Sequence, residues 1–158
     1  MSLPDSVISG RDPVRRHRYF AYGSNMSVRQ MATRCPEAVV VGPALLHDYV
    51  FRINLHGVAT VVPSPESVIY GVAWEISDRD LANLDRYEGV PSFYVRESTF
   101  VEVKGELLPA LIYLAVDSMP GVPREVYLEG IVAAAREHGL PQEYVEELRA
   151  LMMVEVVV

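Results

Sequence analysis

The chain has 158 residues, of which 50% are hydrophobic and 22% are charged, so it is long enough to bury the core of one globular domain and is not composed like a disordered protein. Its formal net charge of −7 argues against partners such as nucleic acid or an anionic membrane, because clustered Lys and Arg side chains supply most of the affinity for phosphate. Cys35 is its single cysteine, which excludes an internal disulfide, and no Cys/His array has the spacing of a metal site.

The first 17 residues mix Ser, Asp, Pro and Arg without periodicity, which predicts a flexible leader over 1–17. This segment lacks the apolar middle region of a signal peptide, and no apolar run in the chain is long enough to span a bilayer. We therefore expect a cytoplasmic protein with no membrane partner, and one domain over residues 18–151.

The first predicted elements are a short aromatic strand over 18–22 and a helix that begins at Ser27. Gln30 lies three residues after Ser27, which is the spacing of a capping box, and the helix is expected to end near Arg34 because Pro36 disfavours helical geometry just before it. Apolar and β-branched runs separated by Gly, Pro, Asn and Ser then predict strands over 38–46, 49–54, 59–62 and 68–76.

The middle of the chain predicts a helix followed by a hairpin. Ser77 is the expected N-cap, and Asp78 and Asp80 favour the positive end of the helix dipole. Gly89 is expected to end this helix. Strands over 94–103 and 107–116 follow, with a hairpin turn between them.

Two further helices are predicted near the end of the chain, over 123–138 and from residue 141 through 151. The apolar tail over 152–158 either adds a strand or contacts a partner subunit, so a homodimer stays open. Strands clustered centrally, with helices at the start, middle and end, indicate an α+β domain built on a mainly antiparallel sheet or barrel.

The first candidate site is the segment Tyr22-Gly23-Ser24-Asn25-Met26, at the end of a predicted strand. Gly23 permits unusual backbone angles and close approach of a ligand, and Ser24 and Asn25 add hydrogen-bonding groups. We also expect the following helix to turn its free N–H groups toward the same place, which suits the binding of a carboxylate. By itself, the pattern also fits a plain turn between a strand and a helix.

The second candidate is Glu88, at the end of a predicted helix and immediately before Gly89 and an apolar Val-Pro pair. The C-terminus of a helix disfavours a carboxylate, so the pKa of Glu88 tends upward, and apolar cover would make it a proton carrier near neutral pH. Two alternatives stay open: Glu88 is exposed to solvent, or it pairs with Arg86 or Arg96, which would lower its pKa.

Other reactive residues give weaker signals. Tyr94, Tyr113 and Tyr127 can line a pocket or simply reach the surface with their hydroxyl groups. Cys35 has no histidine at a supporting spacing and is expected to be a small buried apolar residue. No metal and no cofactor site is predicted.

Taken together, these motifs resemble those of the γ-glutamylcyclotransferase family, including its AIG2-like relatives, from residue 19 to about residue 151. The resemblance is carried, in order, by residues 20–26 (FAYGSNM), 57–61 (GVATV), 63–65 (PSP), 68–74 (VIYGVAW) and 84–90 (LDRYEGV). Residues 139–144 (GLPQEY) are similar to the members that act on γ-glutamyl amino acids.

The resemblance implies a mixed, mainly antiparallel β-barrel with surrounding helices, and a reaction without a cofactor. In that reaction the α-amine of a small γ-glutamyl substrate attacks its own γ-carbonyl and expels the attached amine, leaving 5-oxoproline. By position, the segment from Tyr22 to Met26 would hold the glutamyl group, and Glu88 would take a proton from the α-ammonium and return it to the leaving nitrogen. Tyr113 and Tyr127 match pocket tyrosines of the family.

The identity of the leaving amine stays open among an amino acid, a polyamine, the ε-amine of a lysine and a natural product. Residues 91–93 replace a longer stretch of small residues found in some relatives, at a place expected to border the leaving group. Intact glutathione is disfavoured as the substrate. Two alternatives to the cyclotransferase are a binding domain without turnover, against which the presence of Glu88 argues, and a γ-glutamyl hydrolase or transferase that uses an external nucleophile.

Overall fold

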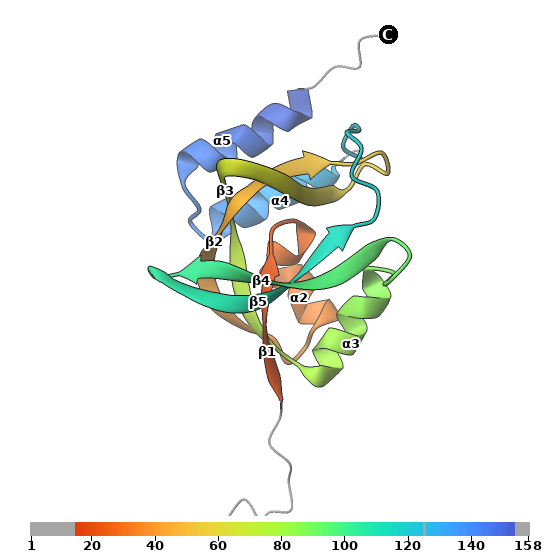
Figure 1. Ribbon diagram of the computed structural model, residues 1–158, viewed down its shortest axis with the longest axis vertical. Coiled ribbons are helices and arrows are strands. Elements are labelled where there is room, and N and C mark those ends of the chain that lie inside the picture. The colour runs from red at the N-terminus through yellow and green to blue at the C-terminus, as the bar shows by residue number, and fades with distance from the viewer. Residues whose placement is uncertain (1–14, 125, 154–158) are drawn as a thin grey trace, which may run out of the picture.

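The computed structural model describes residues 15–124 and 126–153, and in this part of the chain five strands close into a barrel in the order β1-β3-β2-β4-β5 (Figure 1). The strands are β1 (Arg16–Ala21), β2 (Val39–Ile53), β3 (Ala59–Ser77), β4 (Tyr94–Val103) and β5 (Glu106–Ala115). The helices are α2 (Val28–Arg34), α3 (Asp78–Tyr87), α4 (Tyr127–Glu137) and α5 (Gln142–Ala150), with short 3₁₀ turns η1 (Ser24–Met26) and η2 (Leu151–Met153). The predicted α+β class and the mainly antiparallel barrel are confirmed.

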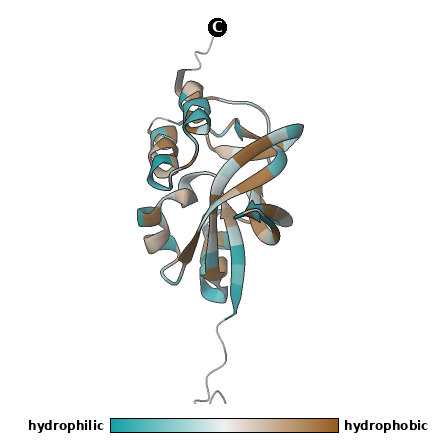
Figure 2. Cartoon of the chain, turned by 90° about the vertical axis from the view of Figure 1, so that its left-hand side faces the viewer, coloured by the Kyte–Doolittle hydropathy of each residue, from teal (hydrophilic) through white to brown (hydrophobic). Residues whose placement is uncertain are grey.

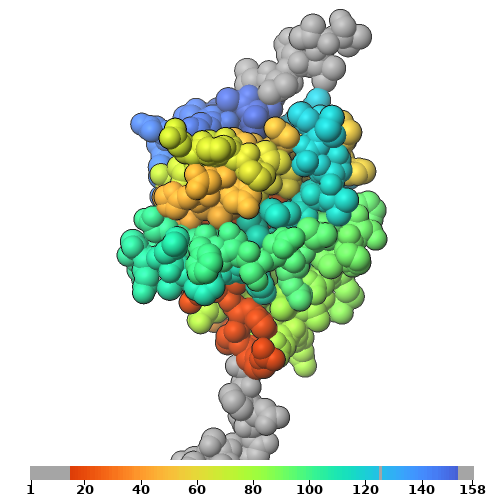
Figure 3. All heavy atoms as spheres, in the orientation of Figure 1, coloured from red at the N-terminus to blue at the C-terminus, as the bar shows by residue number. Residues whose placement is uncertain are grey.

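The barrel consists of two antiparallel pieces that meet along narrow seams. In the first piece, which we call the three-stranded sheet, β3 pairs with both β1 and β2. The second piece is the β4–β5 hairpin, which forms a band across the molecule between β2 and β3 on one side and β1 on the other (Figure 3). Between the two pieces, the described backbone pairing is reduced to Leu45 with Glu102 and to the parallel pair of Tyr19 with Leu111.

One hydrophobic core joins the barrel to the helices that surround it. Each helix contributes to it: Met31 of α2, Leu84 of α3, Ile131 of α4 and Leu148 of α5 are each at most 1% exposed. The helices on the left of Figure 2 carry both hydrophobic and hydrophilic residues, as expected for helices that pack one face and leave the other in solvent. Burial of this apolar surface is the main favourable contribution to the free energy of folding, and the hydrophobic pattern of the sequence anticipates it.

The four strands predicted between residues 38 and 76 are joined into two long ones, because the predicted breaks are irregularities within a continuous strand pair. The β2–β3 register passes from His47 paired with Val68 to Tyr49 paired with Pro63. Asp48, between the two β2 residues, has a positive φ of 67° and accepts a hydrogen bond from the Glu66 N–H at 3.0 Å. The turn-forming residues therefore mark a bulge rather than the end of a strand.

The helix caps differ in how fully the predictions hold. At α3, Ser77 and Asp80 form the complete capping box. At α2, the Gln30 N–H donates to Ser27 Oγ at 3.1 Å, but the Gln30 side chain is directed to Asn25 instead of completing the box. The helix predicted to begin at residue 123 begins at Tyr127, because Val126 has a positive φ of 58° that no helix accommodates.

The predicted ends of the domain shift slightly. β1 begins at Arg16, so two residues of the predicted leader belong to the barrel, and residues 1–14 lie outside the described residues. Met152 and Met153 of the predicted tail continue the last helix as η2, and residues 154–158 lie outside the described residues. Across 15–124 and 126–153, no helix has the length and apolarity needed to cross a membrane.

Candidate active site

A cavity opens where β1 ends and η1 begins, and it brings together almost all of the residues that the sequence singled out. Its lining comprises Tyr19, Phe20, Tyr22, Gly23, Ser24, Asn25, Ala59, Glu88, Tyr94, Tyr113 and Tyr127. Met26 is the exception among the predicted residues, because its side chain is fully buried in the core and does not line the cavity. Tyr19, Phe20 and Ala59 were not predicted as site residues, since none of them had an evident chemical role in the sequence.

The segment after β1 forms a turn with free backbone donors. The Met26 N–H donates to the Gly23 carbonyl at 3.0 Å, which closes η1. Within the described residues, the N–H groups of Gly23, Ser24 and Asn25 donate to no protein acceptor, and all three residues line the cavity. Successive free N–H groups of this kind form an anion-binding concavity.

The expectation that the following helix would supply free N–H groups to this place is wrong. The first N–H of α2, from Val28, donates to Glu137 Oε1 at 3.3 Å, and the Gln30 N–H donates to the cap Ser27. η1 takes over that role, because it inserts one tight turn between β1 and α2. The Met26 carbonyl anchors this turn by accepting a hydrogen bond from His138 Nε2 at 2.6 Å.

Glu88 lies at the C-cap of α3, half-buried in the cavity wall. Its backbone N–H donates to the Leu84 carbonyl at 2.8 Å, which fixes the side chain at the end of the helix. Burial raises the pKa of Glu88 from its ordinary 4.5 to about 7, against the opposing effects of the Arg34 charge and of a hydrogen bond from Asn25. A carboxyl group with this pKa exchanges protons readily near neutral pH.

The alternative in which Glu88 pairs with Arg86 or Arg96 is not what the structure contains. Arg96 pairs with Asp85, and Arg86 donates to Asn83. The cation that acts on Glu88 is Arg34, and it does so through Asn25 and through its charge. Solvent exposure of Glu88, the other alternative, is excluded by its position in the wall.

Asn25 connects Glu88 to Arg34 in a buried hydrogen-bond network. Its Nδ2 donates to the Tyr19 hydroxyl at 2.9 Å and to Glu88 Oε1 at 3.3 Å, and its Oδ1 accepts from Arg34 at 2.7 Å. Because a guanidinium can only donate, Arg34 fixes which end of the amide faces Glu88. The Arg34 guanidinium also lies over the Tyr87 ring, 4.3 Å from its centroid.

Tyr22 and Tyr113 form a second hydrogen-bond network in the cavity wall. The Tyr22 hydroxyl donates to the Tyr113 carbonyl at 2.6 Å, and the Tyr113 hydroxyl donates to Asp85 Oδ1 at 2.7 Å. Burial raises the pKa of both hydroxyls well above the ordinary value, so both are neutral at physiological pH. Both hydroxyl protons are donated to protein acceptors, so the two side chains are held in place in the cavity wall.

Tyr94 and Tyr127 meet at Ala59, at the start of β3, with opposite hydrogen-bonding roles. The Tyr94 hydroxyl donates to the Ala59 carbonyl at 2.7 Å, whereas the Tyr127 hydroxyl accepts from the Ala59 N–H at 3.1 Å. The proton of Tyr127 thus remains available, as does that of Tyr19, whose hydroxyl accepts from Asn25. Among the described residues, neither of these two hydroxyls donates to a protein acceptor.

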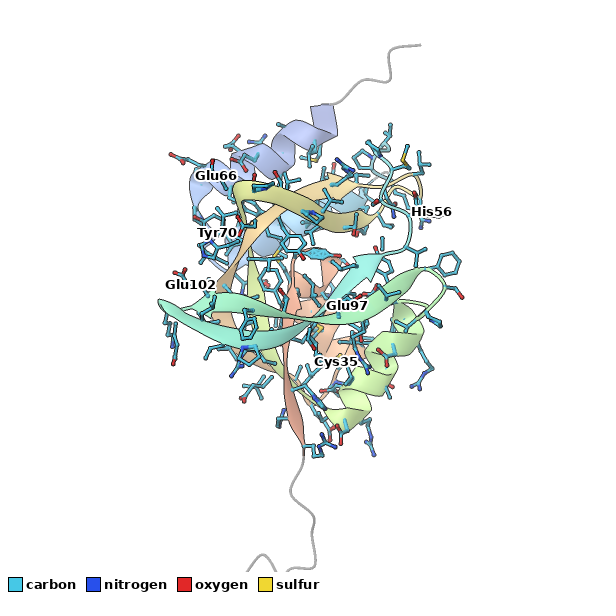
Figure 4. All side chains as sticks on the ribbon, in the orientation of Figure 1. Cys35, His56, Glu66, Tyr70, Glu97 and Glu102 are labelled. Atoms are coloured by element: carbon cyan, nitrogen blue, oxygen red, sulfur yellow. The ribbon has the colours of Figure 1, made fainter. Side chains whose placement is uncertain are left out.

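The cysteine and histidine residues do not form a second reactive centre. Cys35 is buried, as predicted (Figure 4), and burial raises the pKa of its thiol to about 12, so the thiol is not a nucleophile. In the part of the chain that the structure describes, no three His, Cys, Asp or Glu side chains gather as metal ligands would.

Comparison with known proteins agrees with this geometry. Residues 19–130 match the family model described as γ-glutamyl cyclotransferase, AIG2-like. The γ-glutamylcyclotransferase of mouse is 32% identical over 145 residues, covering 84% of this chain and 77% of the mouse protein.

Solved structures show the same fold. One named γ-glutamyl cyclotransferase has a TM-score of 0.81 at 31% identity and covers 86% of this chain and 88% of its own. A yeast γ-glutamyl cyclotransferase specific to glutathione has a TM-score of 0.61 over 87% of this chain and 94% of its own, but at 14% identity that likeness concerns the fold alone. Because the family model spans most of the chain and the mouse relative spans still more, this chain belongs to the γ-glutamyl cyclotransferase, AIG2-like family.

Proposed function

We propose that this protein is a γ-glutamylcyclotransferase that converts a small γ-glutamyl substrate into 5-oxoproline and a free amine. The substrate's α-nitrogen forms a bond to its γ-carbonyl carbon, and the bond from that carbon to the leaving nitrogen breaks. The attacking nitrogen loses two protons on the way from ammonium to lactam, and the leaving nitrogen gains two and departs as an ammonium, so no atom enters from outside. The observation that carries the proposal is Glu88, a carboxyl group with a pKa of about 7 beside free N–H groups in one cavity.

Glu88 is the proposed proton carrier in this reaction. Its carboxylate takes a proton from the α-ammonium and frees the nucleophile, and the resulting acid then protonates the leaving nitrogen. A pKa near neutrality suits both steps, since neither form of the group is strongly favoured. One carboxyl group is therefore sufficient.

The η1 turn is the proposed holder of the glutamyl group. The free N–H groups of Gly23, Ser24 and Asn25 suit the substrate's α-carboxylate or the oxyanion that develops on the γ-carbonyl. Tyr127 and Tyr19 have hydroxyl protons available for the same oxygens.

The remaining predicted residues have supporting roles in this proposal. Tyr22, Tyr94 and Tyr113 shape the wall, because their hydroxyl protons are held by protein acceptors. Met26 supports the turn from beneath, as a buried anchor. We propose that no cofactor takes part, because ring closure is intramolecular and a well-oriented intramolecular attack has an effective molarity on the order of 10⁵–10⁸ M.

The test is to incubate the protein with a panel of γ-glutamyl amino acids and γ-glutamyl amines and to follow 5-oxoproline by mass spectrometry. The variant Glu88→Gln should lower turnover by about 10²–10⁴-fold, because it removes both proton transfers. Glu97→Gln, a change of the same kind at an exposed position of β4 (Figure 4), is the matched control and should retain activity.

Each competing function predicts a different product. Free glutamate in place of 5-oxoproline would indicate a hydrolase, and a new γ-glutamyl conjugate would indicate transfer to an external amine. Binding of γ-glutamyl compounds with no product would indicate a binding domain. Near-normal turnover by Glu88→Gln would remove Glu88 from the mechanism.

A further inference from the structure

Helix α4 packs against the η1 turn at both ends of the turn. At the first end, Gly23 faces the N-terminal half of α4, since a Cβ atom placed on it would lie 3.7 Å from the Tyr127 hydroxyl and 3.8 Å from Ile131 Cδ1. At the second end, the His138 ring, at the C-cap of α4, donates to the Met26 carbonyl at 2.6 Å. These contacts come from the two ends of one helix, so α4 holds the turn along its whole length.

Met26 is the residue of the turn that His138 contacts, and both of its backbone polar groups are bonded. Its N–H donates to the Gly23 carbonyl at 3.0 Å, and its carbonyl accepts from His138. Its side chain is fully buried in the core. Because Met26 is fixed at these three points, it sets the orientation of the peptide groups just before it, and with them the N–H groups of Ser24 and Asn25 that line the cavity.

The His138 ring is itself held in place by its surroundings. Its side chain is 9% exposed, and the Trp74 ring stands edge-on to it, with centroids 6.2 Å apart. Its backbone N–H donates to the Ala134 carbonyl at 3.1 Å, which ties it to the last turn of α4. The neighbouring Glu137 accepts from the Val28 N–H at 3.3 Å, so the same end of α4 also fixes the start of α2. The hydrogen bond to the turn is therefore made by a donor that is already oriented.

We propose that His138 is a positioning residue: by donating to the Met26 carbonyl, its ring holds the η1 turn in the shape that binds the glutamyl group. The inference rests on the function proposed above, in which that turn is the holder. His138 does not line the cavity, so it acts on the substrate through the turn. Donors that are already in place bind a ligand without the cost of ordering the backbone. Because all γ-glutamyl substrates share the glutamyl group, the effect of His138 is the same for every leaving group.

The experiment compares two amide substitutions that differ in where they place an N–H donor. In His138→Gln the amide nitrogen reaches the position of the imidazole Nε2, whereas in His138→Asn it lies near that of Nδ1, away from the Met26 carbonyl. We expect His138→Asn to lower kcat/KM for 5-oxoproline release by about tenfold, which is the size of one lost hydrogen bond. The factor should be the same for γ-glutamyl-L-alanine and γ-glutamyl-L-phenylalanine. His138→Gln should stay within about threefold of the wild type, because it keeps the donor.

Val145→Ala is the control for stability. Val145 is a buried core residue of α5, which packs against α4, so its variant should lower the melting temperature and leave kcat/KM unchanged below the unfolding transition.

Three results would overturn the positioning role while 5-oxoproline release by the wild type still supports the reaction. These are an unchanged kcat/KM in His138→Asn, an equal loss in His138→Asn and His138→Gln, and a matching loss in Val145→Ala. No 5-oxoproline from any γ-glutamyl compound would overturn the proposed function, and this inference with it.

Discussion

At the scale of single residues, the chemistry depends on a balance of opposing effects on Glu88. Burial favours the neutral acid, whereas the Arg34 charge and the Asn25 hydrogen bond favour the carboxylate. Burial prevails, but only far enough to bring the pKa to about 7. Full burial without Arg34 would leave an acid that cannot accept the substrate's proton, and full exposure would leave a carboxylate that cannot return it.

The raised pKa of Glu88 predicts that the stability of the protein depends on pH. Because the folded state holds this proton more tightly than the unfolded chain does, the contribution to stability is complete below the unfolded pKa, near 4.5, and is lost as the pH rises through about 7. Glu88→Gln, which stays neutral, should therefore have a higher melting temperature than the wild type at about pH 8 and a similar one at about pH 5. The measurement is thermal unfolding of both proteins across that pH range. A difference in melting temperature that stays the same at every pH would contradict the prediction.

Arg34 predicts a change in the pH profile of the reaction. Arg34→Gln removes a charge that lowers the pKa of Glu88, so the acidic limb of the kcat/KM profile should move to higher pH. The loss of activity should be larger at about pH 6 than at about pH 8.5, which a purely structural role would not produce. Arg29→Gln, on the exposed side of the same helix, is the control, and an unshifted profile in Arg34→Gln would count against the network.

The position of Glu88 and the motif at the end of β1 were predictable, because a carboxylate at a helix end and a Gly-Ser-Asn turn after a strand are local patterns. The link between them was not. Asn25 in η1 and Arg34 at the end of α2 meet at 2.7 Å only in the folded chain, and Arg34 had no signal beyond its place at the end of a helix. A network of this kind depends on tertiary packing.

At the scale of elements, α3 carries both Glu88 at its C-cap and Asp85, which holds Tyr113. Its start is fixed by Ser77, whose Oγ accepts from the Asp80 N–H at 3.1 Å and donates to Glu37 at 2.6 Å. Ser77→Ala should lower the free energy of unfolding by about 1–2 kcal/mol, since it removes a buried cap. Denaturant titration tests this against Ser98→Ala, an exposed serine of β4, and equal losses would contradict the role of the cap.

Local patterns predicted α3, its N-cap Ser77 and the β4–β5 hairpin, because the residues that start and stop these elements lie within or next to them. They did not predict where α4 begins. Arg124 is tied to Gly57 and His56, far away in the sequence, and these contacts keep the segment before Tyr127 out of the helix. The same contacts hold Arg124 against the connection between β2 and β3.

At the scale of the whole molecule, the active-site cavity lies across the junction between the hairpin and the three-stranded sheet. Tyr94 and Tyr113 come from the hairpin, whereas Ala59 begins β3 of the sheet and Tyr22 directly follows β1. The hydrogen bonds of Tyr22 to the Tyr113 carbonyl and of Tyr94 to the Ala59 carbonyl connect the two pieces there. Side chains of the site therefore hold together a barrel whose backbone ladder is thin at this place.

A bound ligand that contacts both pieces should slow their separation. We expect saturating 5-oxoproline to protect the backbone amides of β4 and β5 from hydrogen–deuterium exchange more than those between β2 and β3. Exchange measured by mass spectrometry with and without the ligand tests this, and uniform protection of all strands would contradict it.

The two single-pair seams also bear on how the protein evolves. A point mutation can remove the hydrogen bonds by which Tyr22 and Tyr94 join the two pieces, whereas it leaves the hydrogen bonds of a backbone ladder in place. The fit of the barrel around its substrate therefore depends on a few tyrosine side chains. Substitutions that remove these hydrogen bonds would widen the entrance to the cavity for bulkier leaving groups and would also lower the melting temperature. The scaffold can thus exchange thermal stability for a broader range of leaving groups in small steps, without rebuilding its core.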